Sequence, residues 1–125
     1  MSLSLEQEKQ RFAPKVAIQL DPPQNTEFTP EELLVFDGVQ DSKMYVAIKG
    51  IVFDVTRNPD SYGPSKGYHV FVGKDCSRAL AKSSLDPNDC TPEWEDLSDK
   101  NKKVLEDWLQ FFTLRYNIVG KVKHI

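Results

Sequence analysis

The sequence of 125 residues predicts one α+β domain, large enough to bury a single hydrophobic core. Two runs rich in β-branched and aromatic residues, Met44–Ile48 and Ile51–Val55, flank Lys49-Gly50 and indicate a hairpin with a tight turn. A long helix is predicted after Ser98, because five large apolar residues share one helical face: Val104, Leu105, Trp108, Leu109 and Phe112. Strands and helices do not alternate regularly, which favours α+β over a parallel sheet.

Residues 1–27 are predicted to be a weakly ordered segment that precedes the folded domain. Pro14 and the run Asp21-Pro22-Pro23 favour extended or turn structure, and the apolar run 16–20 could lie along the domain as an edge strand. We expect the folded domain over residues 28–122, followed by a tail at 123–125.

The domain is expected to open with a short helix. Thr29 as N-cap, Pro30 at the first helical position and Glu32 form a capping-box pattern. Leu33, Leu34 and Phe36 are predicted to point inward, and the helix should end before Gly38.

After the hairpin, Gly63 and Pro64 predict that Tyr62 and Tyr68 lie in a loop that is neither a helix nor a central strand. A helix is predicted over Asp75–Ser83 and a turn at Asp86-Pro87-Asn88. Tyr116 continues the apolar stripe of the long helix. Gly120 is expected to close that segment before a short Lys121-Val122 tail.

Composition excludes several classes of function. A net charge of −3 argues against nucleic-acid binding, which needs a basic face. Cys76 and Cys90 lack the density of a disulfide framework and, with His69, lack zinc-ligand spacing, so they are interpreted as ordinary thiols in a reducing compartment. No stretch reaches the roughly 18 apolar residues of a membrane span and no signal-peptide core is present, which predicts a cytoplasmic protein.

The chemistry-bearing residues do not suggest an enzyme. There is no Gly-x-Ser-x-Gly elbow, and His69 and His124 are the only histidines. A tyrosine phenolate suits ferric haem. Arg115 and Tyr116, at the end of the last helix, are candidates to stabilise the phenolate and to neutralise the haem propionates. A loop tyrosine more often packs its ring and hydrogen-bonds its hydroxyl, so the residues alone leave both interpretations open.

A set of segments in consistent order carries a resemblance to a known family. It comprises residues 28–33, Val46-Ala47-Ile48-Lys49-Gly50, the Tyr62-Gly63-Pro64 loop, residues 70–81, and Arg115-Tyr116-Asn117-Ile118-Val119-Gly120. Over about residues 28–122 the chain resembles the membrane-associated progesterone receptor family, which has the cytochrome b5-like haem/steroid-binding fold. The notable feature of that family is a tyrosine in place of histidine as the iron ligand, and the chain is similar to its soluble, fungal-type members.

The resemblance implies a site and a function. Tyr68 matches the axial ligand of ferric haem b, Tyr62 and Tyr116 match tyrosines that line the haem site, and Arg115 stands where relatives often have lysine. Such proteins bring haem, and in some reports sterols, to haem-thiolate monooxygenases of sterol synthesis. This implies a haem carrier or regulator that meets the endoplasmic reticulum membrane peripherally and forms a haem-dependent homodimer.

The loop before Tyr68 departs from the family pattern. Relatives commonly have Gly-Pro-x-Gly-Pro-Tyr, whereas this chain has Gly63-Pro64-Ser65-Lys66-Gly67-Tyr68, with a charged Lys66 at the rim of the pocket. The same pocket could instead hold a sterol or small lipid without haem, or serve electron transfer as in b-type cytochromes. We also expect His69 to point away from Tyr68, as adjacent residues of an extended segment do.

Overall fold

A four-stranded mixed sheet forms the base of the protein in the computed structural model, which describes residues 20–123. The strand order is β1-β4-β3-β2, with β1 parallel to β4 and the other two pairs antiparallel. The strands are β1 (Thr26–Phe28), β2 (Tyr45–Ile48), β3 (Ile51–Asp54) and β4 (Asn117–Val122). The sheet and its helices confirm the predicted α+β class.

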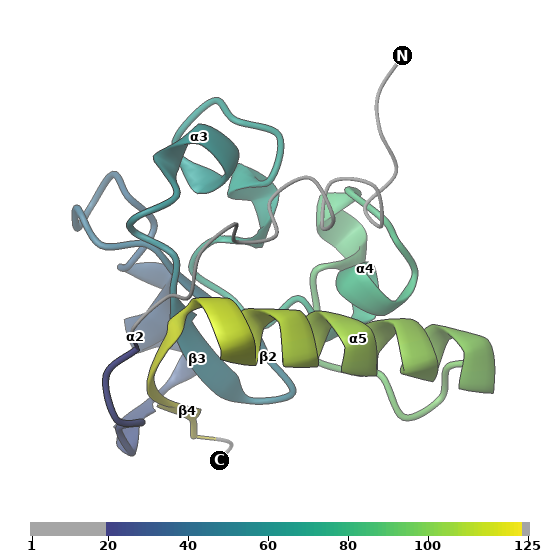
Figure 1. Cartoon of the computed structure of the whole chain (residues 1–125). Helices are drawn as coiled ribbons and strands as arrows, with labels where there is room; N and C mark the ends of the chain where they lie inside the picture. The colour runs from purple at the N-terminus through teal and green to yellow at the C-terminus, as the bar shows by residue number, and fades with distance from the viewer. Residues whose placement is uncertain (1–19, 124–125) are drawn as a thin grey trace.

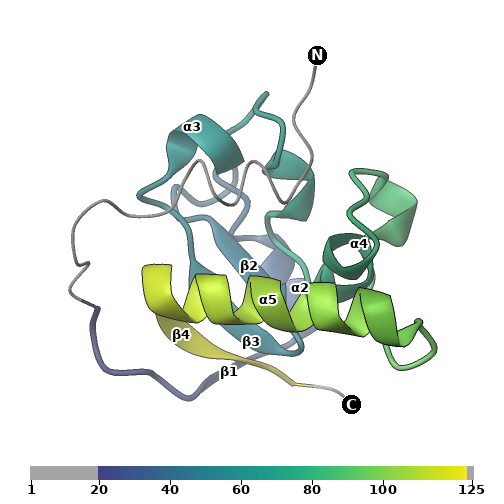
Figure 2. The ribbon, with the colours of Figure 1, turned by 45° about the vertical axis from the view of Figure 1, so that its right-hand side comes forward.

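Within residues 20–123, four α-helices and two 3-10 turns surround this sheet. They are α2 (Pro30–Leu34), α3 (Pro59–Tyr62), η1 (His69–Phe71), α4 (Ser77–Ala81), η2 (Pro87–Asp89) and α5 (Asp99–Arg115). The long helix α5 crosses the sheet (Figures 1 and 2). Helix α3 lies near the C-terminal end of α5, and α4 lies near its N-terminal half. Among residues 20–123, no helix has the length and apolar character to cross a bilayer.

Both predicted N-caps are present. Thr29 Oγ1 accepts from the backbone N–H of Glu32 at 3.1 Å, and Glu32 Oε1 accepts from the N–H of Thr29 at 3.0 Å, which is a complete capping box. Ser98 Oγ accepts from the N–H of Asn101 at 3.2 Å at the start of α5. These local signals place the two helices where the sequence predicts them.

The predicted hairpin is also confirmed. Lys49 and Gly50 have φ angles of 50° and 80°, the left-handed pair that a two-residue hairpin turn needs. The turn is anchored from outside, because the N–H of Lys49 donates to Ser77 Oγ (2.7 Å) and that of Gly50 donates to Asp75 Oδ2 (2.9 Å). Asp75 therefore holds this turn, and the helix predicted over Asp75–Ser83 is shorter, covering Ser77–Ala81 only.

Residues alternate between two cores on the two sides of the hairpin. Val46 and Phe53 belong to the larger cluster, which includes Trp108 and Phe112 of α5. Ala47 and Val52 belong to a smaller cluster with Leu33 of α2. Side chains along the hairpin thus alternate between the two clusters, and the site lies on the side of the larger one.

Three sequence-based expectations are wrong or incomplete. Leu34 does not point inward but is 52% exposed, because a five-residue helix buries one narrow face, that of Leu33. Gly120 does not close a segment before a tail but lies within β4, in the interior of the sheet. The sheet starts at Thr26, two residues before the predicted start of the domain. Of the run 16–20, only Leu20 is among the described residues, and it lies outside the strands.

Candidate functional site

The first site tyrosine, Tyr62, ends a helix rather than lying in a loop. Pro59 at its first turn starts α3, and Gly63 ends it, with its N–H donating to the carbonyl of Pro59 at 2.9 Å. A Cβ at Gly63 would lie 2.5 Å from that carbonyl oxygen, so only glycine fits. The prediction that this segment cannot be helical is therefore wrong for Tyr62, because Gly63 and Pro64 follow the last helical residue.

Hydrogen bonds tie the following loop back onto α3. The N–H of Tyr68 donates to the carbonyl of Ser61 at 3.0 Å. His69 Nδ1 lies 2.9 Å from the carbonyl oxygen of Tyr62, which can only accept, so Nδ1 carries the proton. We expected His69 to point away from Tyr68 because that holds for adjacent residues of an extended segment. Tyr68 has φ −99° and ψ 8° and precedes η1, so this segment is not extended.

The three predicted tyrosines come together in the larger core. The ring centroid of Tyr62 is 5.9 Å from that of Tyr68 and 6.2 Å from that of Tyr116. Their side chains come from α3, from the loop before η1 and from the C-cap of α5, and all three are buried, at 3%, 8% and 7% exposure. Phe71 and Phe112 extend the cluster, at 5.7 Å from Tyr68 and 5.0 Å from Tyr116.

The Tyr62 hydroxyl stays protonated at neutral pH, because its pKa is raised. Burial raises the pKa of Tyr62 well above its ordinary value, and the neighbouring Tyr116 and Tyr68 raise it further, while the Arg115 charge lowers it. Tyr116 Oη accepts from Asn58 Nδ2 at 2.9 Å. Tyr116 is also the largest cause, after burial, of the raised pKa of Tyr62.

Arg115 lies beside the tyrosines and faces a cavity. The cavity, about 220 Å³, is lined by Leu20, Asp54, Arg57, Asn58, Arg115, Tyr116 and Asn117. Arg115 Nη1 is buried and has no hydrogen-bond partner within the described part of the chain, while its guanidinium carbon lies 5.6 Å from the Phe111 ring centroid. Arg57 and Arg115 outnumber Asp54, so the cavity suits an anionic group. Tyr62 and Tyr68 are not among its lining residues.

Arg57 and Asn58 are site residues that sequence reasoning missed. Both precede Pro59, and that position signals the start of a helix rather than a site. Their side chains line the cavity with Arg115, which comes from the other end of the chain. No local pattern predicts such a meeting.

The donor set fits a haem. Buried phenol oxygens can coordinate or hydrogen-bond, and a cavity with two arginines and an unsatisfied guanidinium nitrogen suits carboxylate groups such as haem propionates. Between residues 20 and 123, no three His, Cys, Asp or Glu side chains gather as a metal site.

Comparisons with known proteins relate the chain to a family and a fold. A family model described as "Cytochrome b5-like Heme/Steroid binding domain" matches residues 29–110. The chain is 46% identical over 97 residues to Probable steroid-binding protein 3 of Arabidopsis thaliana, covering 77% of this chain and 97% of that one. Among solved structures, it is similar to a hypothetical protein from Arabidopsis thaliana described as having a cytochrome b5 like fold. The TM-score is 0.74 at 41% identity, over 83% of this chain and 96% of that one.

Other relatives are longer than the matched region. The chain is 39% identical over 107 residues to the cytochrome P450 regulator dap1 of Schizosaccharomyces pombe, covering 64% of it. It is 37% identical over 99 residues to human membrane-associated progesterone receptor component 2, covering 44% of it. The similarity to these two proteins therefore concerns one domain of each.

Proposed function

Because the chain belongs to the cytochrome b5-like haem/steroid-binding family, in its membrane-associated progesterone receptor branch, we propose that it binds ferric haem b through Tyr68. We further propose that it acts as a haem carrier or regulator of haem-thiolate monooxygenases and not as an enzyme. The observation that carries this proposal is the meeting of Tyr62, Tyr68 and Tyr116 in one buried cluster next to Arg115.

Each residue of the cluster has a distinct part in the proposal. The bound group would supply a ferric ion, for which a phenolate is a hard anionic ligand. Tyr68 would give up its proton to serve as that ligand. Tyr62, whose pKa is raised well above the ordinary value, keeps its proton and serves as a hydrogen-bond donor. Arg115, with Arg57 across the cavity, would hold the carboxylates in place.

A sterol- or lipid-binding module without haem is the second candidate. The name of the Arabidopsis relative, 46% identical, favours it. So does Lys66, which replaces an expected glycine before the ligand and adds a cation to the loop. Electron transfer ranks third, because phenolate ligation stabilises ferric iron and makes its reduction difficult.

The wider setting is part of the same proposal. We place the binding domain at residues 28–122 and expect peripheral association with the endoplasmic reticulum through a monooxygenase partner. If Tyr68 were the protein's single ligand to the iron, bound haem could take part in self-association, so we propose that a homodimer forms only with haem. Sedimentation of the protein with and without haem tests this point, and equal mass in both forms would remove the haem-dependent dimer.

Haem titration followed by visible spectroscopy tests the function. The wild type should bind haem with a high-spin ferric, tyrosinate-type spectrum, and Tyr68→Phe should lose that spectrum. Tyr45→Phe is the matched control, because Tyr45 packs in the smaller core next to Ala47 and should bind as the wild type does. An unchanged spectrum in Tyr68→Phe would show that Tyr68 is not the ligand.

A parallel titration separates the two candidates. Haem-free protein and haem-loaded protein are each titrated with a fluorescent sterol. Sterol binding with equal affinity in both forms, together with no Soret band after haem addition, would favour the haem-free module. A Soret band with no saturable sterol binding would favour the haem protein.

A further inference from the structure

The two cysteines, fourteen positions apart, are brought together by the fold. Cys76 is the N-cap residue of α4 and is fully buried in the larger core. Cys90 follows η2 as its C-cap, is partly buried, and packs against that same core. The two thiols lie close enough for each to be the largest cause of the other's pKa shift. Cys76 Sγ also lies 3.7 Å from the carbonyl oxygen of Phe71, and Cys90 Sγ lies 3.8 Å from that of Asp86.

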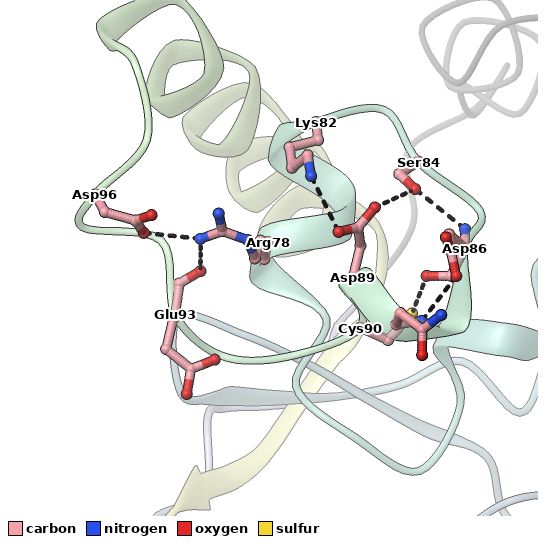
Figure 3. A network of polar contacts seen from close by, with 9 residues as sticks. Arg78, Lys82, Ser84, Asp86, Asp89, Cys90, Glu93 and Asp96 are labelled. Carbon is pink, nitrogen blue, oxygen red and sulfur yellow. Dashed lines mark hydrogen bonds and ion pairs between the residues drawn. The ribbon is translucent and has the colours of Figure 1, made fainter.

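A scaffold of polar contacts holds the Cys90 segment against α4 (Figure 3). The N–H of Arg78 donates to the carbonyl of Thr91 at 3.1 Å, which fixes the residue after Cys90 to the first turn of α4. Lys82 Nζ pairs with Asp89 Oδ1 at 3.0 Å, and Arg78 Nη1 pairs with Asp96 Oδ1 at 2.8 Å. Ser84 Oγ donates to Asp89 Oδ2 at 2.8 Å. The segment that carries Cys90 is therefore fixed against α4 on both sides of Cys90.

Only one of the two cysteines is open to a small molecule. Cys90 borders a cavity of about 180 Å³ that Leu33, Leu34, Pro92 and Lys74 also line, whereas Cys76 is not among the lining residues. This volume exceeds by several fold the roughly 30 Å³ that one water molecule occupies in the liquid. A hydroperoxide can enter it, with the Lys74 side chain at its wall. Cys76 is fully buried and does not line this cavity.

The pKa shifts also distinguish the two thiols, because they favour ionisation of Cys90 over Cys76. The interaction with Cys76 lowers the pKa of Cys90, and the Lys74 charge lowers it further, while burial and the charges of Asp89 and Asp86 raise it. The interaction with Cys90, together with burial, raises the pKa of Cys76 far above its ordinary value. A thiolate forms first at the accessible sulfur.

We propose that Cys90 is a peroxide-reactive thiol and that Cys76 resolves its oxidation into an intrachain disulfide. The Cys90 thiolate attacks one oxygen of hydrogen peroxide, the O–O bond breaks, and the departing hydroxide takes a proton to become water. Cys76 sulfur then attacks the sulfenic sulfur, the S–O bond breaks, and the proton of Cys76 leaves with the hydroxyl as water. In sum, two thiols and one peroxide give one disulfide and two waters. Nothing in this step depends on haem.

Mass spectrometry of the full chain after peroxide treatment tests the proposal. The wild type should lose two hydrogen masses and yield one linked peptide pair containing Cys76 and Cys90, which dithiothreitol reverses. In Cys76→Ser, dimedone should trap a sulfenic acid on Cys90. In Cys90→Ser, Cys76 should stay reduced. Links between chains, or two free thiols under conditions that oxidise glutathione, would overturn the proposal.

A second measurement needs no variant and so does not depend on how a replaced core residue folds. Native wild-type protein is labelled with a maleimide in a time course, and each cysteine is quantified by peptide mapping. We expect Cys90 to react at least about tenfold faster than Cys76, since thiolate fraction and access both favour it. Equal rates, or faster labelling of Cys76, would contradict the assigned roles.

Discussion

The side-chain amide of Asn58 donates a hydrogen bond of 2.9 Å to the hydroxyl oxygen of Tyr116, joining residues 58 positions apart. This bond fixes the C-terminal end of α5 to the residue that begins α3. It thereby sets the position of Tyr116 relative to Tyr62, whose ring lies 6.2 Å away. The tyrosine cluster thus depends on a residue that carries no haem-ligand chemistry of its own.

Asn58→Ala should lower the free energy of unfolding by about 1 kcal/mol, because one partly buried hydrogen bond is lost. Urea denaturation followed by circular dichroism measures it. Asn88→Ala is the control, because the hydrogen bond found for exposed Asn88 uses its backbone N–H, and it should change stability by less than about 0.5 kcal/mol. Equal losses in both variants would show that the bond to Tyr116 contributes nothing specific.

Stability should fall with alkaline pH because of Tyr62. Its pKa is raised in the folded protein, whereas an unfolded tyrosine titrates near about 10. The stabilisation is therefore complete below that pH and is lost as the unfolded chain releases its proton, with a slope of about 1.4 kcal/mol per pH unit for one group. Urea denaturation between pH 8 and 11 should show a shallower decline in Tyr62→Phe than in the wild type. Parallel curves for the two proteins would assign the decline to other groups.

Gly120→Ala should destabilise the protein by about 3 kcal/mol or abolish folding. An added Cβ would lie 2.2 Å from the carbonyl oxygen of Thr26 and 2.6 Å from Cε2 of Phe28, forcing β1 away from β4. Gly67→Ala is the matched control, since its added Cβ meets nothing within 4 Å, and it should leave the melting temperature nearly unchanged. Differential scanning calorimetry compares the two variants.

Arg115→Gln should weaken haem binding by roughly tenfold, equivalent to about 1.4 kcal/mol, through loss of a cation that faces the cavity. Titration followed by Soret absorbance measures the change. Lys100→Gln removes the same charge from the exposed N-terminal turn of α5 and should bind haem as the wild type does. If both variants weaken binding equally, the effect is one of net charge and not of the cavity.

Features set by neighbouring residues were predictable from the sequence. The Thr29 capping box, the Ser98 cap and the Lys49-Gly50 turn each depend on a few adjacent residues with fixed backbone preferences. The long-range pairings were not predictable in this way. Asn117–Val122 has the composition of a strand, but its place between β1 and β3 depends on partners about 65 and 95 positions earlier in the chain.

The residues of the candidate site likewise fall into those that could be predicted from the sequence and those that could not. Tyr62, Tyr68, Tyr116 and Arg115 were identified through resemblance, because nothing in their own spacing brings them together. Asn58 and Arg57 carry no such signature and become visible only when α3 and the end of α5 meet. The contact between Cys76 and Cys90 was not predicted. The spacing of cysteines in a sequence can indicate a metal site or a disulfide framework, but it does not reveal that a turn packs on a helix.

The parallel pairing of β1 with β4 has a mechanical consequence. Thr26 lies opposite Gly120 and Phe28 opposite Val122, so the chain enters at one end of this strand pair and leaves at the other. A pulling force applied through the two ends of the chain would slide β1 along β4 and load their hydrogen bonds simultaneously, in shear. Antiparallel terminal strands would instead open like a zipper, one bond at a time. Under such a force, the β1–β4 pair would be the first part of the described structure to bear the load and would resist it.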